Sequence, residues 1–250
     1  MRIVDAAEMR AFRAHGYVLL PAVLDGAMLA RGRAIAAAML AAQPPPAGHA
    51  GPHFLWPRFG NDPHPLLDFY RDVGLAGIAA SLLRPDLTVD EPEFAQLATT
   101  IPPWPHRPGG PHVDGLTPPP PDGRPGTFSL LCGIWLSGQQ EPNRGNLWVW
   151  PGTHLRFSAW LAEHGADALA RTDLMNPGPY PRVDLGDPVQ LTGPAGSVLF
   201  AHYLLAHNIG GHDGPAGGPR REVIYYRLHA VGHAGRWREV VTSPLAEIRG

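Results

Sequence analysis

The side chains with the clearest capacity for chemistry are His112 and Asp114, with further histidines about ninety residues along the chain. On an extended segment, residues i and i+2 project to the same face, so an imidazole and a carboxylate could hold one metal ion together. The tripeptide is a weak signal by itself because the chain contains 13 His. A third ligand is needed, and the stretch GSVLFAHYLLAHN supplies His202 and His207, with His212 beyond it.

Two histidines and one carboxylate form the facial triad that holds non-haem Fe(II) and leaves coordination positions open. If His202 and His207 share one strand, their spacing of five points them to opposite faces, and position favours His207 as the ligand. Arg220 and Arg221 open the next apolar run, and a guanidinium fork can bind a dicarboxylate bidentately. We favour Arg221, because Arg220 would share its strand face with Glu222, which repels a carboxylate.

The elements that must position these residues fall into two groups. Helical spacing predicts helices from Asp5 to Ala14, from Asp25 to Ala42 and from 66 to 83, with a strand over 17–20 and a loop over 47–65. From residue 94 onward, short apolar runs separated by Gly and Pro predict strands. Their expected ranges are 94–101, 127–136, 147–150, 189–191, 197–202 and 222–231, with one helix over 158–170.

This order predicts an α+β fold, a double-stranded β-helix (jelly roll, cupin-like) core with N-terminal helices packed on one sheet. We expect a single domain over 1–250, with 1–90 mainly helical support and 91–250 the catalytic core. No composition break separates a second domain.

Composition excludes several classes of function. With a formal net charge of -2, the chain lacks the overall positive charge that non-specific nucleic-acid binding requires. All 20 cationic side chains are Arg, which excludes Schiff-base and P-loop lysine chemistry. The lone Cys132 cannot form an intrachain disulfide. No apolar run reaches the length of a membrane span, and the first ten residues lack signal-peptide order, so we expect a cytoplasmic enzyme.

Four segments together resemble the phytanoyl-CoA dioxygenase family of Fe(II)- and 2-oxoglutarate-dependent oxygenases, and the likeness runs along most of the chain. The opening FRAHGYVLLPAVLD is similar to the family's entry of helix, Gly-Tyr, strand and Pro. The His-x-Asp at 112–114 follows, then NRGNLWVWPGTH over 143–154. The fourth segment is GSVLFAHYLLAHNIGG with PRREVIYYRL.

The resemblance implies that His112, Asp114 and His207 ligate iron, and that Arg221 or Arg220 anchors the C5 carboxylate of 2-oxoglutarate. Some relatives place a Lys near 2-oxoglutarate, which this chain cannot do. The candidates to replace that Lys are Gln96, Thr100 and Ser129.

Substrate contacts are expected from three segments, over 49–65, 104–111 and 155–188, and the individual candidates are His106, Arg107 and Trp150. For His154 we expect a turn-closing role, and for His202 a hydrogen-bonded place in the sandwich.

The expected function is hydroxylation of an unactivated C–H bond of a small molecule, with release of succinate and CO₂. A secondary metabolite is one such substrate. The cofactors would be Fe(II), 2-oxoglutarate and O₂. Desaturation, cyclisation and epimerisation remain open, as do substrate identity and oligomeric state. The alternatives are a cupin-like metal-dependent isomerase or hydrolase without 2-oxoglutarate, and a non-catalytic jelly-roll binding protein.

Overall fold

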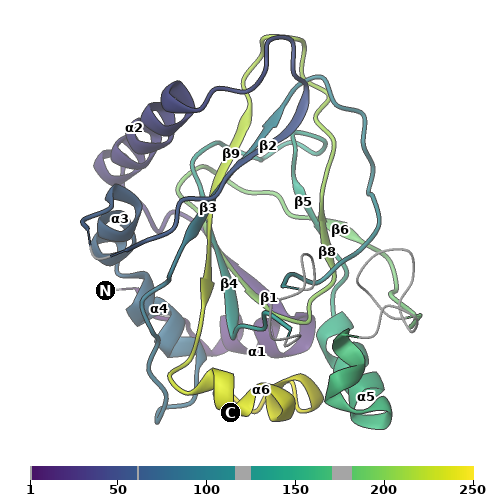
Figure 1. Ribbon diagram of the computed structural model, residues 1–250. Helices are drawn as coiled ribbons and strands as arrows, with labels where there is room; N and C mark the ends of the chain where they lie inside the picture. Colours follow the sequence, from purple (N-terminus) through teal and green to yellow (C-terminus); the bar gives the residue numbers. More distant parts are fainter. Residues whose placement is uncertain (1, 61, 116–124, 171–181) are drawn as a thin grey trace.

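A computed structural model describes residues 2–60, 62–115, 125–170 and 182–250 (Figure 1). The helices are α1 (Ala6–His15), α2 (Gly26–Ala42), α3 (Pro65–Val73), α4 (Leu75–Leu82), α5 (Thr153–His164) and α6 (His233–Thr242), with a 3₁₀ helix η1 (Ala166–Ala170). The first strands are β1 (Tyr17–Leu20), β2 (Gly51–Leu55), β3 (Ala95–Ile101), β4 (Leu130–Trp135) and β5 (Leu147–Val149). The later strands are β6 (Val189–Gln190), β7 (Val198–His202), β8 (His207–Ile209) and β9 (Arg221–Leu228).

Two antiparallel sheets form the core. The large sheet has the order β1-β7-β4-β9-β3-β2 and the small one β6-β5-β8. Helices α2, α3 and α4 line the outer side of the large sheet, and the small sheet faces its inner side (Figure 1). Buried apolar side chains form one cluster under the helices and another between the sheets. The expected jelly roll with N-terminal helices on one sheet is confirmed.

Local chemistry explains where the first helices begin. Asp5 caps α1 by accepting hydrogen bonds from the backbone N–H groups of Ala7 and Glu8, and the Glu8 side chain in turn accepts one from the Asp5 N–H. Asp25 accepts a hydrogen bond from the Met28 N–H in the same way at α2. The sequence analysis placed the starts of both helices at these two aspartates.

The single helix expected over 66–83 is wrong, because Gly74 divides it into α3 and α4. Gly74 adopts φ 73°, a left-handed conformation that ends α3. Pro65, in the first turn of α3, has the fixed φ that a helix start requires. The helix expected over 158–170 begins earlier, at Thr153, and closes in a 3₁₀ turn.

The loop expected over 47–65 contains strand β2, which pairs with β3 along the edge of the large sheet. An edge strand tolerates Pro52 because one side of its backbone needs no ladder bond. The C-terminal helix α6 was not foreseen. His202 and His207 do not share a strand, since His202 ends β7 in the large sheet and His207 begins β8 in the small one. No helix in the described ranges is long and apolar enough to cross a membrane.

Candidate metal and dicarboxylate site

His112, Asp114 and His207 converge on one point. Their potential ligand atoms all lie within 4.8 Å of one another, and they are the only such group of three among the described residues. Each histidine Nε2 lies 3.7 Å from Asp114 Oδ1. The two imidazole centroids are 4.5 Å apart. Separations of this size leave room for an ion between the three side chains.

Backbone pairing fixes the two histidines relative to each other. The His112 N–H donates to the His207 carbonyl at 3.1 Å, and the His207 N–H donates to the His112 carbonyl at 3.2 Å. In the side chain of His207, Nδ1 lies 2.9 Å from the Leu205 carbonyl oxygen and therefore carries the proton. That bond leaves the Nε2 lone pair of His207 directed at the group, as in metal-binding histidines.

Asp114 is held by an arginine that the sequence analysis did not select. Arg227 donates to Asp114 Oδ2 from Nη2 at 2.6 Å and from Nε at 3.1 Å. Its Nη1 donates to Gln96 Oε1 at 2.8 Å. Because Oδ2 is occupied in this way, Oδ1 is the oxygen that faces the histidines. Strand alternation carried the signal, since Arg227 shares a face of β9 with Arg221.

The protonation states suit metal binding. Burial by itself would raise the pKa of Asp114, but the Arg227 charge and the two histidines more than compensate, so its pKa lies well below the usual range. Burial lowers the pKa of His112 to about 4, and the neighbouring His207 adds to the shift. At neutral pH the group therefore offers an ionised carboxylate and an unprotonated His112 imidazole, the forms that metals require.

Arg221 lies in the same cavity, and its guanidinium is buried without a counter-charge. The residue is 2% exposed, yet no described carboxylate lies within ion-pair distance of it. Its Nη2 donates to the Tyr225 hydroxyl at 2.6 Å and its Nε to Gln139 Oε1 at 3.2 Å. A buried, unpaired cation is costly unless an anion accompanies it.

Two further polar atoms beside Arg221 are buried without a partner in the described structure, Thr100 Oγ1 and Gln139 Nε2. Thr100 faces Arg221 in the β3–β9 register. Gly145, at φ 81°, packs against Thr100 and Arg221. A Cβ at this position would lie 3.0 Å from the side chains of both residues. This explains the Gly in the NRGN segment. Unused hydrogen-bonding capacity around a buried guanidinium indicates a site for a carboxylate.

One cavity of ≈ 340 Å³ joins the metal-ligand group to the Arg221 end. Its described lining comes from β2, β3, β4, β9, the 112–115 segment and the small sheet. The lining residues are Phe54, Trp56, Gln96, Ala98, His112, Val113, Asp114, Gly115, Leu131, Leu147, His207, Asn208, Ile209, Arg221, Tyr225 and Arg227. The 49–65 segment thus contributes two aromatic residues, whereas residue 61 and residues 171–181 of the expected wall lie outside the described ranges.

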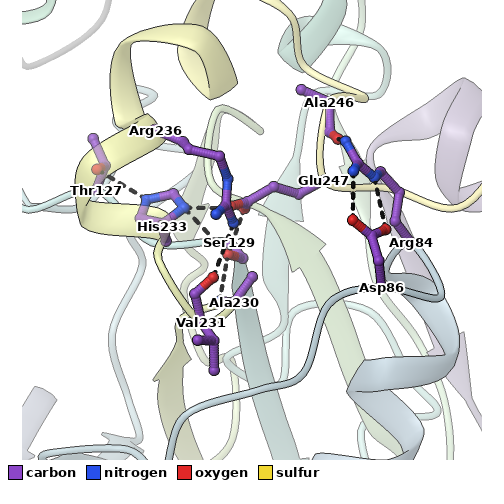
Figure 2. A network of polar contacts seen from close by, with 10 residues as sticks. All are labelled: Arg84, Asp86, Thr127, Ser129, Ala230, Val231, His233, Arg236, Ala246 and Glu247. Carbon is purple, nitrogen blue, oxygen red and sulfur yellow. Dashed lines mark hydrogen bonds and ion pairs between the residues drawn. The ribbon is translucent and has the colours of Figure 1, made fainter.

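The structure places Arg220 and Ser129 away from this cavity. Arg220 pairs with Glu222 at 2.5 Å, and its side chain is 38% exposed. The Ser129 hydroxyl donates to Glu247 Oε2 at 2.6 Å, within a buried network that also contains His233 and Arg236 (Figure 2). Of the three candidates for the missing Lys, Gln96 lines the cavity and Thr100 lies beside Arg221.

The three substrate candidates do not line the cavity in the described structure. His106 stacks on Trp104 with ring centroids 4.6 Å apart, and Arg107 pairs with Asp213. Trp150 is 5% exposed and packs in the core between the sheets.

The expected turn at His154 is instead the first turn of α5. The His154 ring is buried and lies 5.3 Å from the ring of His202. In His202, Nδ1 accepts from the Leu204 N–H and Nε2 donates to the Pro244 carbonyl. His202 is therefore a hydrogen-bonded interior residue.

No family model and no curated protein matches the sequence. Solved structures do match. EctD from S. alaskensis is 21% identical, with 91% of this chain and 78% of that chain covered and a TM-score of 0.62. SnoK, a non-haem α-ketoglutarate-dependent carbocyclase from nogalamycin biosynthesis, is 19% identical, with coverage of 93% and 90% and a TM-score of 0.58. HygX from Streptomyces hygroscopicus, solved with nickel and 2-oxoglutarate, is 14% identical, with coverage of 91% and 88% and a TM-score of 0.58. The chain shares the fold of such enzymes.

Proposed function

We propose that this protein is an Fe(II)- and 2-oxoglutarate-dependent oxygenase. His112, Asp114 and His207 would hold the metal, and Arg221 would bind the distal carboxylate of 2-oxoglutarate. The observation that carries the proposal is the buried Arg221 guanidinium, which has no described carboxylate partner and shares a cavity with the ligand group. The sequence resemblance to the phytanoyl-CoA dioxygenase family and the fold comparison both support it.

The donor set fits a non-haem iron. Two imidazoles and one carboxylate are the ligands that hold Fe(II) while leaving positions for a co-substrate and O₂. Because Arg227 occupies Asp114 Oδ2, the carboxylate would bind through one oxygen. When bound, iron with 2-oxoglutarate and O₂ supplies oxidation of an unactivated C–H bond, releasing succinate and CO₂ and most simply leaving a hydroxylated small molecule.

The chain's own residues would orient the co-substrate. Arg221 offers a planar fork of N–H donors, which suits a carboxylate better than a point charge does. The Tyr225 hydroxyl accepts from Arg221 and keeps the fork in place. Thr100 Oγ1 and Gln139 Nε2 have no described partner and would donate to the same carboxylate. Gln96 acts at the other end of the cavity, where it holds Arg227.

A spectroscopic titration tests the proposal. Anaerobic addition of Fe(II) and 2-oxoglutarate to the full chain should give a weak visible charge-transfer band. Arg221→Leu should weaken 2-oxoglutarate binding at least tenfold, since a charge-assisted pair would be lost. Arg220→Leu is the matched control, because that neighbouring side chain pairs with Glu222 outside the cavity. Metal binding with no 2-oxoglutarate dependence would favour an isomerase or hydrolase instead.

A further inference from the structure

Among the described residues that line the cavity, no charged side chain is left to pair with a charged substrate. Within the proposed function, Asp114 serves the metal, Arg221 serves 2-oxoglutarate, and Arg227 is neutralised by Asp114. His112 and His207 also serve the metal, and the Tyr225 hydroxyl accepts from Arg221. The other polar side chains of the described lining, Gln96 and Asn208, are uncharged. Asn208 donates to the Gly110 carbonyl at 2.7 Å and accepts from the Ile209 N–H at 2.8 Å. A substrate with a net charge would therefore enter without a partner, at a cost.

Aromatic side chains form the rim of the same cavity. Phe54 is 39% exposed and Trp56 is 50% exposed, and both line the cavity. The other large apolar residues exposed on the described surface do not line it; these are Ile3, Leu155, Val189 and Val231. Water contact with two neighbouring rings is unfavourable, and such a patch at a cavity mouth marks a binding surface.

The rim is supported from behind. The Phe54 and Trp56 rings meet edge to face, with centroids 6.4 Å apart and an interplanar angle of 75°. Phe94 packs against Trp56 at 6.2 Å. The Arg227 guanidinium carbon lies 5.0 Å from the Trp56 centroid and 5.8 Å from that of Phe94. One of the groups that hold Trp56, Arg227, therefore also fixes the metal ligand Asp114.

The size of the cavity indicates how a substrate would divide between interior and rim. A volume of ≈ 340 Å³ is small for a ligand cavity, and 2-oxoglutarate would occupy part of it. The apolar side chains Val113, Leu131 and Leu147 line the interior. Only the reacting part of a substrate would fit inside, so the remainder would lie on Phe54 and Trp56.

We propose that the substrate of this oxygenase is an uncharged molecule with a planar aromatic or conjugated ring system that stacks on Trp56 and Phe54. The inference rests on the proposed function and names its substrate class. Ring stacking contributes beyond the area that it buries, whereas a saturated ring gains only the area term. Planarity and neutrality are thus two separate properties for which the site should select.

Calorimetry with three probes of one skeleton tests both properties. The full chain is loaded with Ni(II) and saturating 2-oxoglutarate, so that no turnover occurs. The probes are 2-naphthalenemethanol, its decahydro counterpart and 2-naphthylmethylammonium. The planar alcohol should bind about tenfold more tightly than the saturated alcohol, and more tightly than the ammonium. Equal affinity for the two alcohols, or a preference for the cation, would overturn the inference.

Variants locate the binding. Trp56→Leu should weaken 2-naphthalenemethanol about tenfold, and Trp56→Phe should weaken it less, because a smaller ring remains. Trp160→Leu is the matched control, since Trp160 lies on α5, is partly buried and does not line the cavity. Both Trp56 variants should retain 2-oxoglutarate affinity, which is titrated first. Failure of 2-oxoglutarate to bind the unaltered chain refutes the proposed function, whereas normal 2-oxoglutarate binding without ring preference refutes only this inference.

Discussion

Two clusters in this protein combine histidine, a carboxylate and arginine, and only one of them can bind anything more. The cavity cluster consists of His112, Asp114, His207 and Arg227. The C-terminal cluster consists of Ser129, Thr127, His233, Arg236 and Glu247 (Figure 2). Both use a carboxylate that an arginine holds by one oxygen. They differ in what the other oxygen and the imidazole nitrogens do.

Every polar atom at the centre of the C-terminal cluster is bonded. His233 Nδ1 lies 3.0 Å from Glu247 Oε2, and His233 Nε2 lies 3.0 Å from Thr127 Oγ1. Arg236 donates to Glu247 Oε1 at 3.0 Å. Ser129 fills the remaining space by donating to Oε2 and accepting from the Ala230 N–H. This cluster ties the segment after α6 to the start of β4.

In the cavity cluster the corresponding atoms, Asp114 Oδ1 and the Nε2 atoms of the two histidines, have no hydrogen-bond partner among the described residues. Both histidine Nε2 atoms lie 3.7 Å from Asp114 Oδ1, beyond hydrogen-bonding distance, and they border a cavity. A saturated network stabilises a fold, whereas a network with lone pairs directed at open space can bind a ligand. Residue types alone do not distinguish the two clusters.

The largest contrast should come from removing the carboxylate of the cavity cluster. Asp114→Ala should abolish succinate release and metal binding, because two imidazoles remain as ligands. Loss of the Arg227 partner should lower the unfolding temperature. Unfolding should stay cooperative, since Gln96 and the rings of Trp56 and Phe94 still hold Arg227. Asp213→Ala, at an exposed carboxylate outside the cavity, is the control. Unchanged turnover in Asp114→Ala would refute the metal assignment.

Glu247→Ala should lower the stability of the fold and leave the metal site intact. Its side chain is 3% exposed, and removal leaves His233 and Arg236 without their partner. Breaking a buried pair in this way costs about 3–5 kcal/mol in the free energy of unfolding. Metal affinity should be unchanged. Chemical denaturation measures the free energy of unfolding, and calorimetry with Mn(II) measures the metal affinity. Glu239→Ala, at an exposed carboxylate, is the control.

The same carboxylate sets a pH dependence. Burial would raise the pKa of Glu247, but hydrogen bonds from His233, Ser129 and Arg236 lower it below the ordinary 4.5. The ionised form thus stabilises the native state above pH 4.5, and this stabilisation is lost as the pH falls through the lowered pKa. Glu247→Gln should flatten that acid limb of a stability curve.

Arg227 should affect binding more moderately than Asp114. Arg227 orients the metal ligand Asp114 by donating to Oδ2, and it does not itself contact the histidines. Loss of a residue that holds a metal ligand in this way weakens metal binding about 10- to 100-fold. Arg227→Lys should recover part of the affinity, because one donor can still reach Oδ2, whereas Arg227→Leu should not. Titration with Mn(II) measures both. Arg238→Leu, which removes an exposed ion pair with Asp167, should leave the affinity for Mn(II) unchanged.

The sequence predicted the large elements well because their signals are local. The helix starts at Asp5 and Asp25, the 17–20 strand and the later apolar runs each depend on neighbours a few residues away. The division at Gly74 also had a local signal, a Gly within a segment of helical spacing. Strand β2 escaped because its Gly and Pro resemble a loop, and only its pairing with β3 makes it a strand.

For the two clusters, sequence reasoning brought together the members of one and not those of the other. Family spacing singled out His112, Asp114 and His207, and alternation along β9 favoured Arg221 over Arg220. Ser129 was considered for the co-substrate because nothing in the sequence connects it with His233 and Glu247, which lie more than a hundred residues away. Long-range partners of this kind follow from topology, which periodicity does not encode.

The buried pair of His154 and His202 should make a further, smaller contribution to the pH dependence of stability. Burial lowers the pKa of His154 to about 4 and that of His202 to about 3. The unfolded chain takes up protons on both below about pH 6.5 while the native state does not, so stability should fall as the pH drops from 6.5 toward 4. His154→Gln should reduce this slope by up to about 1.4 kcal/mol per pH unit, measured by denaturation at several pH values.

The smallest effects should separate two hydroxyl groups that the sequence alone ranked equally. Ser129→Ala leaves the Ala230 N–H and one Glu247 oxygen short of a partner, which costs about 1–3 kcal/mol of stability. Thr100→Val replaces a hydroxyl that has no described partner, so stability should hold or rise slightly while 2-oxoglutarate binds a few-fold less tightly. If Ser129→Ala weakened 2-oxoglutarate and Thr100→Val did not, the division between a closed cluster and an open one would be wrong, because the closed network would then communicate with the cavity.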